Sequence, residues 1–237
     1  MTALSATPTG HRLEQDNFLD NGIATCDSAE GLTALSRPEI ELVIWQRSLP
    51  LPLRDWVEQS RVSQLPDLRI LLRPQDASLA LRSLLSTGGT WPADIRDLLI
   101  ADIANVAAEF SRIAQTDLVD IRLEGVNHDA CWKFHRDRVE ARLLTTYGGP
   151  ATQWVQPIHA EQALREQKQY QGPIEQLQDN AVAIFKGTCA GDGSGIVHRS
   201  PPVADTGETR LLLCLNKPLV TSPSPWVGDP SAPRPLT

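Results

Sequence analysis

Residues 131–150 read CWKFHRDRVEARLLTTYGGP, and this stretch decides how the C-terminal half of the chain is interpreted. It places His135 two residues before Asp137 and continues with an alternating run that is typical of a β-strand. Alternate side chains of a strand point to the same face, so the two residues can offer an imidazole and a carboxylate to one ion. Taken alone, such a pair is more often a polar start of a strand than half of a metal site.

The alternation also assigns a face to this strand. If the strand continues without a bulge, the face of His135 and Asp137 is mostly apolar, as the interior of a barrel should be. The residues expected on that face are Val139, Ala141, Leu143, Thr145 and Tyr147. The opposite face would carry Arg138, Glu140 and Arg142, as a solvated exterior should. The candidate ligands would therefore lie at the mouth of an apolar cavity, where small-molecule sites are found.

The rest of the C-terminal half is typical of short strands. Alternating or apolar runs separated by Gly, Pro and Asp occur at 117–126, 138–147, 152–155, 180–187 and 208–216. Residues 159–178, rich in Gln and Glu, are predicted to be a helical or loop insertion between two strands. Five short strands with little helix favour a sandwich or a small barrel.

The N-terminal half has a different sequence pattern, in which helical periodicity predominates. The apolar run IELVIW at 40–45 is typical of a buried strand, and helical patterns follow at 52–64, 76–86 and 92–115. In the last of these, apolar residues recur every three or four positions after Pro92, which predicts a helix packed on a sheet. We therefore expect an α+β protein with four parts: a loosely ordered arm at 1–37, an α/β region at 38–116, a strand-rich core at 117–217 and a Pro-rich tail at 218–237.

Composition narrows the class of protein. The chain has 237 residues, 41% hydrophobic and 22% charged, with a formal net charge of -7, which argues against nonspecific binding to nucleic acid or to an anionic membrane. No apolar run is long enough to span a bilayer, and the N-terminus lacks the pattern of a signal peptide. We therefore expect a cytoplasmic protein whose four cysteines are thiols or ligands rather than disulfides.

A second chemical signal lies in residues 195–216, GIVHRSPPVADTGETRLLLCLN. His198 joins His135 and Asp137 to make a set of two histidines and one carboxylate, which leaves open positions on Fe(II) for a co-substrate and dioxygen. Arg210 is predicted to point inward at the start of the last strand, where its planar fork suits a carboxylate held by two hydrogen bonds. A structural Arg–Asp bridge is the equally weighted alternative for this arginine.

The order of these residues resembles the prolyl-hydroxylase branch of the Fe(II)/2-oxoglutarate-dependent oxygenases. The resemblance covers about 135–216 and rests on the HxD pair, an Arg-x-Leu-Thr-x-Tyr run, Asp179 before an apolar strand, and a distal histidine followed by Pro-Val, Gly and Arg. It implies a double-stranded β-helix, iron held by His135, Asp137 and His198, and 2-oxoglutarate contacted by Arg210 and Tyr147. The spacing from His198 to Arg210 is slightly longer than usual, and the last strand lacks the usual aromatic signature.

A second resemblance covers the run from Cys131 to the last strand and is to a bacterial family of unknown function. Some of its members are placed under zinc-responsive control near metallochaperone GTPases, which implies a zinc site or a role in metal homeostasis. Cys131 and Cys189 could then be additional ligands, since thiolates favour zinc over catalytic iron.

The sequence thus predicts an oxygenase, with a zinc-dependent enzyme or a non-catalytic zinc protein as the alternative. It predicts a small molecule or a protein side chain as substrate, without specifying which.

Overall fold

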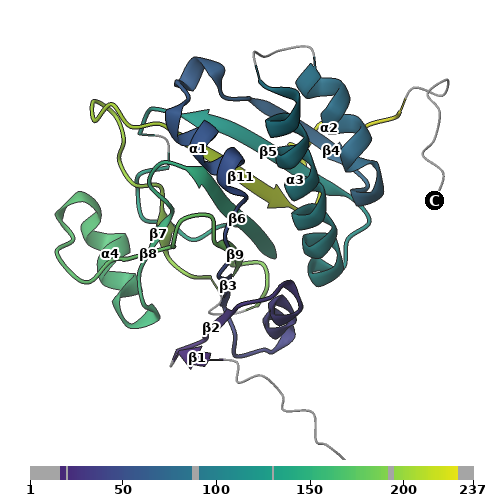
Figure 1. Cartoon of the computed structure of the whole chain (residues 1–237). Helices are drawn as coiled ribbons and strands as arrows, with labels where there is room; N and C mark the ends of the chain where they lie inside the picture. Colours follow the sequence, from purple (N-terminus) through teal and green to yellow (C-terminus); the bar gives the residue numbers. More distant parts are fainter. Residues whose placement is uncertain (1–16, 20, 87–90, 130, 192–194, 229–237) are drawn as a thin grey trace, which may run out of the picture.

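A sheet of eight strands forms the centre of the structure, which is a computed structural model that describes residues 17–19, 21–86, 91–129, 131–191 and 195–228 (Figure 1). The pair β2–β3 is parallel and the other neighbouring pairs in this sheet are antiparallel. In spatial order the strands are β1 (Asn17–Leu19), β2 (Ile23–Cys26), β3 (Leu42–Trp45), β9 (Val182–Lys186), β6 (Ala141–Gly148), β11 (Arg210–Asn216), β5 (Val119–Val126) and β4 (Leu68–Leu72).

Helices cover one face of this sheet. The helices α1 (Leu51–Gln59), α2 (Ala77–Ser86) and α3 (Ala93–Ala114) lie together on that face in Figure 1. The helix predicted at 92–115 is confirmed, with Pro92 at its N-cap and Gln115 in the left-handed conformation at its end. The first predicted helix ends earlier than expected, because the chain turns at Ser60 and continues as a short 3₁₀ turn at Val62–Gln64.

Alternation along β11 shows how the two faces differ. Leu211, Leu213 and Leu215 are fully buried in the main core, which the sheet forms with α1, α2 and α3. Leu212 and Cys214 point to the opposite face and are only partly buried. A strand places successive side chains on opposite faces, so one segment serves both a packed core and a second, more polar surface.

A small second sheet lies on that other side of the large sheet. It has the order β10 (His198–Arg199), β7 (Gln153–Trp154) and β8 (Glu175–Gln176), and α4 (Ala160–Glu166) lies between β7 and β8 in the chain. The predicted insertion at 159–178 therefore contains α4 and the strand β8. A second apolar cluster, which includes Trp154 of β7 and Leu144 of β6, joins the two sheets.

Part of the segment assigned to a loosely ordered arm is built into the sheet, which corrects that expectation for residues 23–36. β2 pairs with β3, and the 3₁₀ helix Ala29–Ser36 buries Leu32 and Leu35 in the main core. The sequence contains no signal for these elements, because a strand of four residues and a single 3₁₀ helix show no sustained hydrophobic period. Residues 1–16 of the arm lie outside the described residues.

The expected division between 38–116 and 117–217 also differs from the structure. β3 and β4 of the first region pair with β9 and β5 of the second, so both regions share one sheet. The start of the Pro-rich tail lies along β4, where the Trp226 amide donates to the Leu71 carbonyl at 2.7 Å. Residues 229–237 of the tail lie outside the described residues.

The expected mixed α and β content is confirmed, and the large sheet is mainly antiparallel. Among the helices in the described part of the chain, none combines the length and the apolar character needed to cross a membrane.

Candidate metal centre

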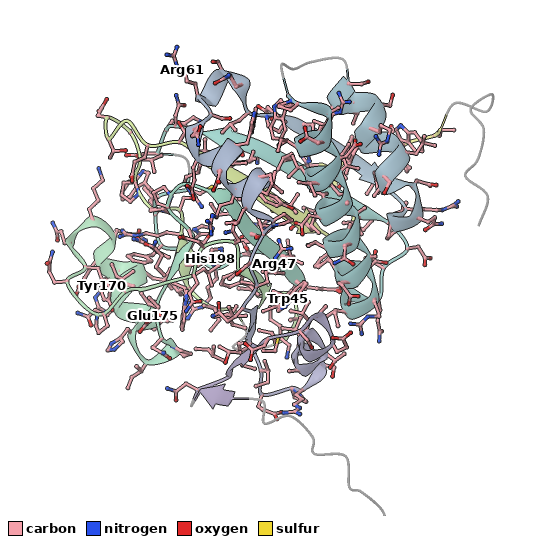
Figure 2. All side chains as sticks on the ribbon, in the orientation of Figure 1. Trp45, Arg47, Arg61, Tyr170, Glu175 and His198 are labelled. Atoms are coloured by element: carbon pink, nitrogen blue, oxygen red, sulfur yellow. The ribbon has the colours of Figure 1, made fainter. Side chains whose placement is uncertain are left out.

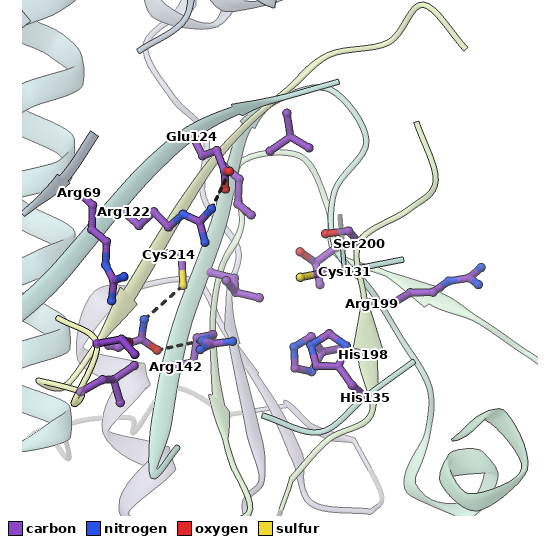
Figure 3. A pocket seen from close by; sticks show the side chains of 17 residues that line it. Arg69, Arg122, Glu124, Cys131, His135, Arg142, His198, Arg199, Ser200 and Cys214 are labelled. Carbon is purple, nitrogen blue, oxygen red and sulfur yellow. Dashed lines mark hydrogen bonds and ion pairs between the residues drawn. The ribbon is translucent and has the colours of Figure 1, made fainter. Parts of the chain in front are cut away.

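The structure brings His135, Asp137 and His198 together, with one candidate ligand atom from each lying within 4.8 Å of the others. His198 begins β10, and His135 pairs with it through two backbone hydrogen bonds of 3.0 Å, in which each amide donates to the other residue's carbonyl. Directly opposed residues in such a pair project side by side, so the two imidazole rings lie 4.6 Å apart (Figure 3). The backbone pairing therefore fixes the spacing of the two rings.

Both imidazoles are held with the same nitrogen facing the aspartate. His135 Nδ1 lies 2.8 Å from the Lys133 carbonyl, and His198 Nδ1 lies 3.0 Å from the Ile196 carbonyl. A carbonyl only accepts hydrogen bonds, so each Nδ1 carries a proton, and each ring in its neutral form offers the Nε2 lone pair. Backbone contacts of this kind orient histidine ligands in metal sites.

Asp137 presents a buried oxygen that lacks a partner. Its Oδ2 makes no hydrogen bond to a described residue, although His198 Nε2 lies 3.3 Å away. When the imidazole is neutral, its Nε2 lone pair faces the carboxylate oxygen at this distance, an arrangement that a bound cation would stabilise. His135 Nε2 lies 3.6 Å from the other oxygen. The donor set therefore fits a divalent metal ion.

Arg142 of β6 engages the remaining oxygen of this aspartate. Its Nη1 donates to Asp137 Oδ1, and its Nε donates to Asn216 Oδ1 at 2.9 Å. Burial alone would raise the pKa of Asp137, but a protonated His198, through its hydrogen bond and its charge, and the charge of Arg142 outweigh it and lower the pKa. Burial and the adjacent His198 also lower the pKa of His135. Both shifts favour the protonation states that bind metal.

A close backbone approach holds Asp137 in place. The Thr188 amide donates to the Asp137 carbonyl at 2.8 Å, and the Cys189 amide donates to the Val139 carbonyl at 3.1 Å. At Gly187, a Cβ atom would lie only 2.3 Å from the Val139 carbonyl oxygen and 2.7 Å from that of Asp137. Only glycine permits this contact, so the segment after β9 fixes the turn that carries the aspartate.

The two histidines line a cavity of about 280 Å³ between the sheets. Figure 3 shows them on one side of the cavity, with Cys131 and Ser200 nearby and with Arg122, Arg142 and Cys214 across it. His135 is 34% exposed whereas His198 is 4% exposed, so an ion would be reached past His135. In Figure 2, His198 lies between the large sheet and the α4 segment.

Arg210 is fully buried, and its three guanidinium nitrogens have no hydrogen-bond partner among the described residues. It begins β11 and pairs across the sheet with Val126, which lines the cavity. Burial lowers its pKa to about 10, against weaker opposing effects of Cys131 and Glu124. A guanidinium in this state lacks the anion that its planar fork is suited to hold. The Arg–Asp bridge considered as an alternative is not formed with any described residue.

Tyr147 lies on the other face of the large sheet, in the main core. Its hydroxyl donates to Asp102 Oδ2 of α3 at 2.6 Å, and Asp102 also pairs with Arg47, which lies beside Trp45 in Figure 2. Burial raises the pKa of Tyr147 well above its usual value. The structure does not place Tyr147 among the residues that line the cavity.

The expected face of the 138–147 segment is wrong, and this explains the position of Tyr147. The strand begins at Ala141, and a bend at 138–140 separates it from Asp137. As a result Leu143 and Tyr147 pack under the helices, whereas Arg142 and Leu144 face the cavity. The bend contains no Gly or Pro, so the sequence carried no turn signal for it.

The two cysteines considered as ligands differ in position. Cys131 is exposed and lines the cavity, while Cys189 lines a separate groove with Glu140 and Lys217. Neither belongs to the group that could hold a metal ion. Arg69, Arg122, Arg142 and Asn216 line the cavity and were missed as site residues, because each is a common surface residue without a distinctive spacing.

Several solved structures resemble this fold. The C-terminal truncated T7H of Neurospora crassa in apo form is 11% identical, with a TM-score of 0.44 over 87% of this chain and 99% of that one. The full-length T7H of Neurospora crassa in complex with alpha-KG is 10% identical, with a TM-score of 0.42 over 86% and 88%. A prolyl-4-hydroxylase of Pseudomonas putida is 10% identical, with a TM-score of 0.40 over 80% and 98%. Similarity this low leaves the chemistry to be argued from the site.

Comparison with curated proteins gave no match. A family model described as a protein of unknown function (DUF1826) matches residues 26–216, which include every strand from β3 to β11 and all three candidate ligands. The expected resemblance to a family of unknown function is thereby confirmed. The chain belongs to the DUF1826 family.

Proposed function

We propose that this protein is a non-haem Fe(II)- and 2-oxoglutarate-dependent oxygenase. The observation that carries the proposal is the set of His135, Asp137 and His198, with both Nε2 atoms and a buried carboxylate oxygen directed at one point beside a cavity. Two histidines and one carboxylate leave positions on Fe(II) for exogenous ligands, whereas a structural zinc site is closed by four protein ligands.

Arg210 supports 2-oxoglutarate as the co-substrate. A buried guanidinium with three unsatisfied nitrogens is costly, and the distal carboxylate of a 2-oxo acid would satisfy it through two parallel hydrogen bonds. By strand alternation Arg210 shares the face of β11 that carries Leu212 and Cys214, and its cross-strand partner Val126 lines the cavity, although Arg210 is not itself among the lining residues. The proposal includes a double-stranded β-helix formed by the two sheets, with the candidate metal centre and the cavity between them.

The chain's own residues would have separate tasks at this site. Arg142 would keep Asp137 Oδ1 occupied so that Oδ2 faces the metal, and Phe185, whose ring lies 4.7 Å from that of His198, would support the buried imidazole. Leu144 and Leu212 would exclude water from the inner wall of the cavity. Bound Fe(II) would supply the oxidation, in which dioxygen and 2-oxoglutarate react with substrate to give succinate, carbon dioxide and a hydroxylated product.

The test is an anaerobic titration of metal-free protein, first with Fe(II) and then with 2-oxoglutarate. We expect a weak visible charge-transfer band that requires both additions and disappears in His135→Ala. His128→Ala is the matched control, because His128 is exposed and lies outside the candidate metal centre. Conversion of 2-oxoglutarate to succinate in air by the iron-loaded protein would then establish turnover.

The opposite result would be the absence of the band together with tight zinc binding that depends on the same three residues. That result would refute the oxygenase and favour the zinc protein, with Cys131 as a further ligand because it lines the same cavity. Zinc binding together with the charge-transfer band would be consistent with the oxygenase, because such sites bind zinc more tightly than Fe(II) whatever metal they use in catalysis.

A further inference from the structure

Two arginines lie side by side on the cavity face of the large sheet, away from the candidate metal centre. Arg69 of β4 is the direct cross-strand partner of Arg122 of β5, and both line the cavity (Figure 3). Like charges directly opposite each other destabilise a sheet unless other charges compensate. Their placement inside a concave site therefore needs an explanation.

The partners of these arginines leave part of their binding capacity available. Arg69 donates from Nε and Nη2 to Asp120 at 3.1 and 2.6 Å, and Ser222 of the tail donates to the same carboxylate at 2.6 Å. Arg122 makes one hydrogen bond to a described residue, from Nη2 to Glu124 Oε1 at 2.6 Å, and its side chain is 51% exposed. The first guanidinium is thus oriented by a buried acid, and the second keeps most of its donors toward the cavity.

The charge of the cavity is opposite to that of the chain. Five arginines line or adjoin the cavity, whereas three carboxylates pair with them or face it, although the chain has a net charge of -7. The arginines are Arg69, Arg122, Arg142, Arg199 and Arg210, and the carboxylates are Asp120, Glu124 and Asp137. A cleft lined by one sign of charge concentrates ligands of the opposite sign.

We propose that Arg69 and Arg122 form a receptor for an acidic group, a carboxylate or a phosphate, on the molecule that is processed at this site. The inference rests on the proposed function, in which Arg210 holds the co-substrate. The two receptors are distinct, because the cross-strand partner of Arg122 on β11 is Cys214, four residues from Arg210. Four strand residues span roughly 13 Å, too far for one carboxylate to reach both.

The test measures binding of inorganic phosphate to the full chain by calorimetry or by phosphorus NMR, first without metal. We expect saturable binding that weakens at least about tenfold in Arg122→Gln and in Arg69→Gln, as loss of a charge-assisted hydrogen bond implies. Arg82→Gln is the matched control. Arg82 also makes one 2.6 Å bond to a carboxylate, Asp97, and its side chain is 54% exposed, but it lies on α2 away from the cavity.

The same titration is then repeated with Mn(II) and 2-oxoglutarate bound, and with acetate in place of phosphate. Undiminished phosphate binding in the presence of 2-oxoglutarate would support a separate receptor, whereas competition between them would place the anion at Arg210 and overturn the inference. Phosphate binding equal in Arg122→Gln and wild type would also overturn it. Because the first titration requires neither metal nor co-substrate, its failure is distinguishable from failure of the charge-transfer experiment.

Discussion

The two faces of the large sheet carry residues from the same strands and have opposite characters. The face under α1, α2 and α3 is largely apolar, and the polar groups buried there include the linked Arg47, Asp102 and Tyr147. The other face carries arginines, an asparagine and a thiol around a cavity. The apolar face therefore provides the stability that allows the other face to hold unsatisfied polar groups.

Two neighbouring leucines of β11 point to opposite faces of the sheet, so replacing each one tests the difference between the faces directly. Leu213→Ala should lower the free energy of unfolding by about 2–5 kcal/mol, because it leaves a cavity in a fully buried core. Leu212→Ala should cost less than about half as much, since Leu212 is partly exposed and already borders a cavity. Denaturant unfolding of both variants measures the difference, and equal losses would contradict the division between the faces.

On the polar face, Arg142 should control the metal affinity of the site without touching the metal. Arg142→Gln should weaken Co(II) or Zn(II) binding by about 10–100-fold, as loss of a partner that orients a ligand does elsewhere. Arg142→Lys should recover part of the affinity, because an ammonium keeps the charge while losing the second bond to Asn216. Competition with a chromophoric chelator gives the affinities. An unchanged affinity in both variants would show that Asp137 is oriented by its backbone contacts alone.

Arg210 should lower stability while it serves binding. Its pKa of about 10 lies below the usual value of 12.5, so burying the charged guanidinium lowers the free energy of unfolding at neutral pH. This loss of stability is relieved only as the pH rises above 10, where the folded protein releases the proton. Arg210→Met should therefore raise the free energy of unfolding by about 1–3 kcal/mol in the absence of ligand. It should also abolish stabilisation by 2-oxoglutarate in a thermal melt of the Mn(II)-loaded protein. A destabilised variant would indicate that the guanidinium has a partner in solution.

The helices and strands of the apolar face could largely be predicted from sequence, because periodic burial leaves a periodic pattern. α3 follows from residues spaced along 92–115, and β11 follows from the run at 208–216. The three residues of the candidate metal centre could be predicted from the sequence, because HxD and a distal histidine are local motifs. Its surroundings were not, because the bend at 138–140 reverses the face of β6, and Arg69 reaches the cavity through a pairing between β4 and β5 that no local pattern reveals.

For Tyr147, the family resemblance and the structure predict different roles. The resemblance implies that its hydroxyl contacts 2-oxoglutarate, whereas the structure directs it to Asp102 on the helix-facing side. From the structure we expect Tyr147→Phe to leave the affinity for 2-oxoglutarate unchanged. It should lower the free energy of unfolding by about 1–2 kcal/mol, because Asp102 loses a hydrogen bond, although Arg47 still neutralises its charge.

Titration of the Fe(II) charge-transfer band in Tyr147→Phe, alongside its denaturant unfolding, separates the two roles. Asp102→Asn is the informative companion variant, since it perturbs the same buried group from α3 without altering β6. If both variants lose stability and keep the affinity for 2-oxoglutarate, the hydroxyl belongs to the packed face. A tenfold loss of affinity confined to Tyr147→Phe would instead mean that β6 presents this side chain to the cavity when the co-substrate binds. The division between the two faces would then hold only for the ligand-free protein.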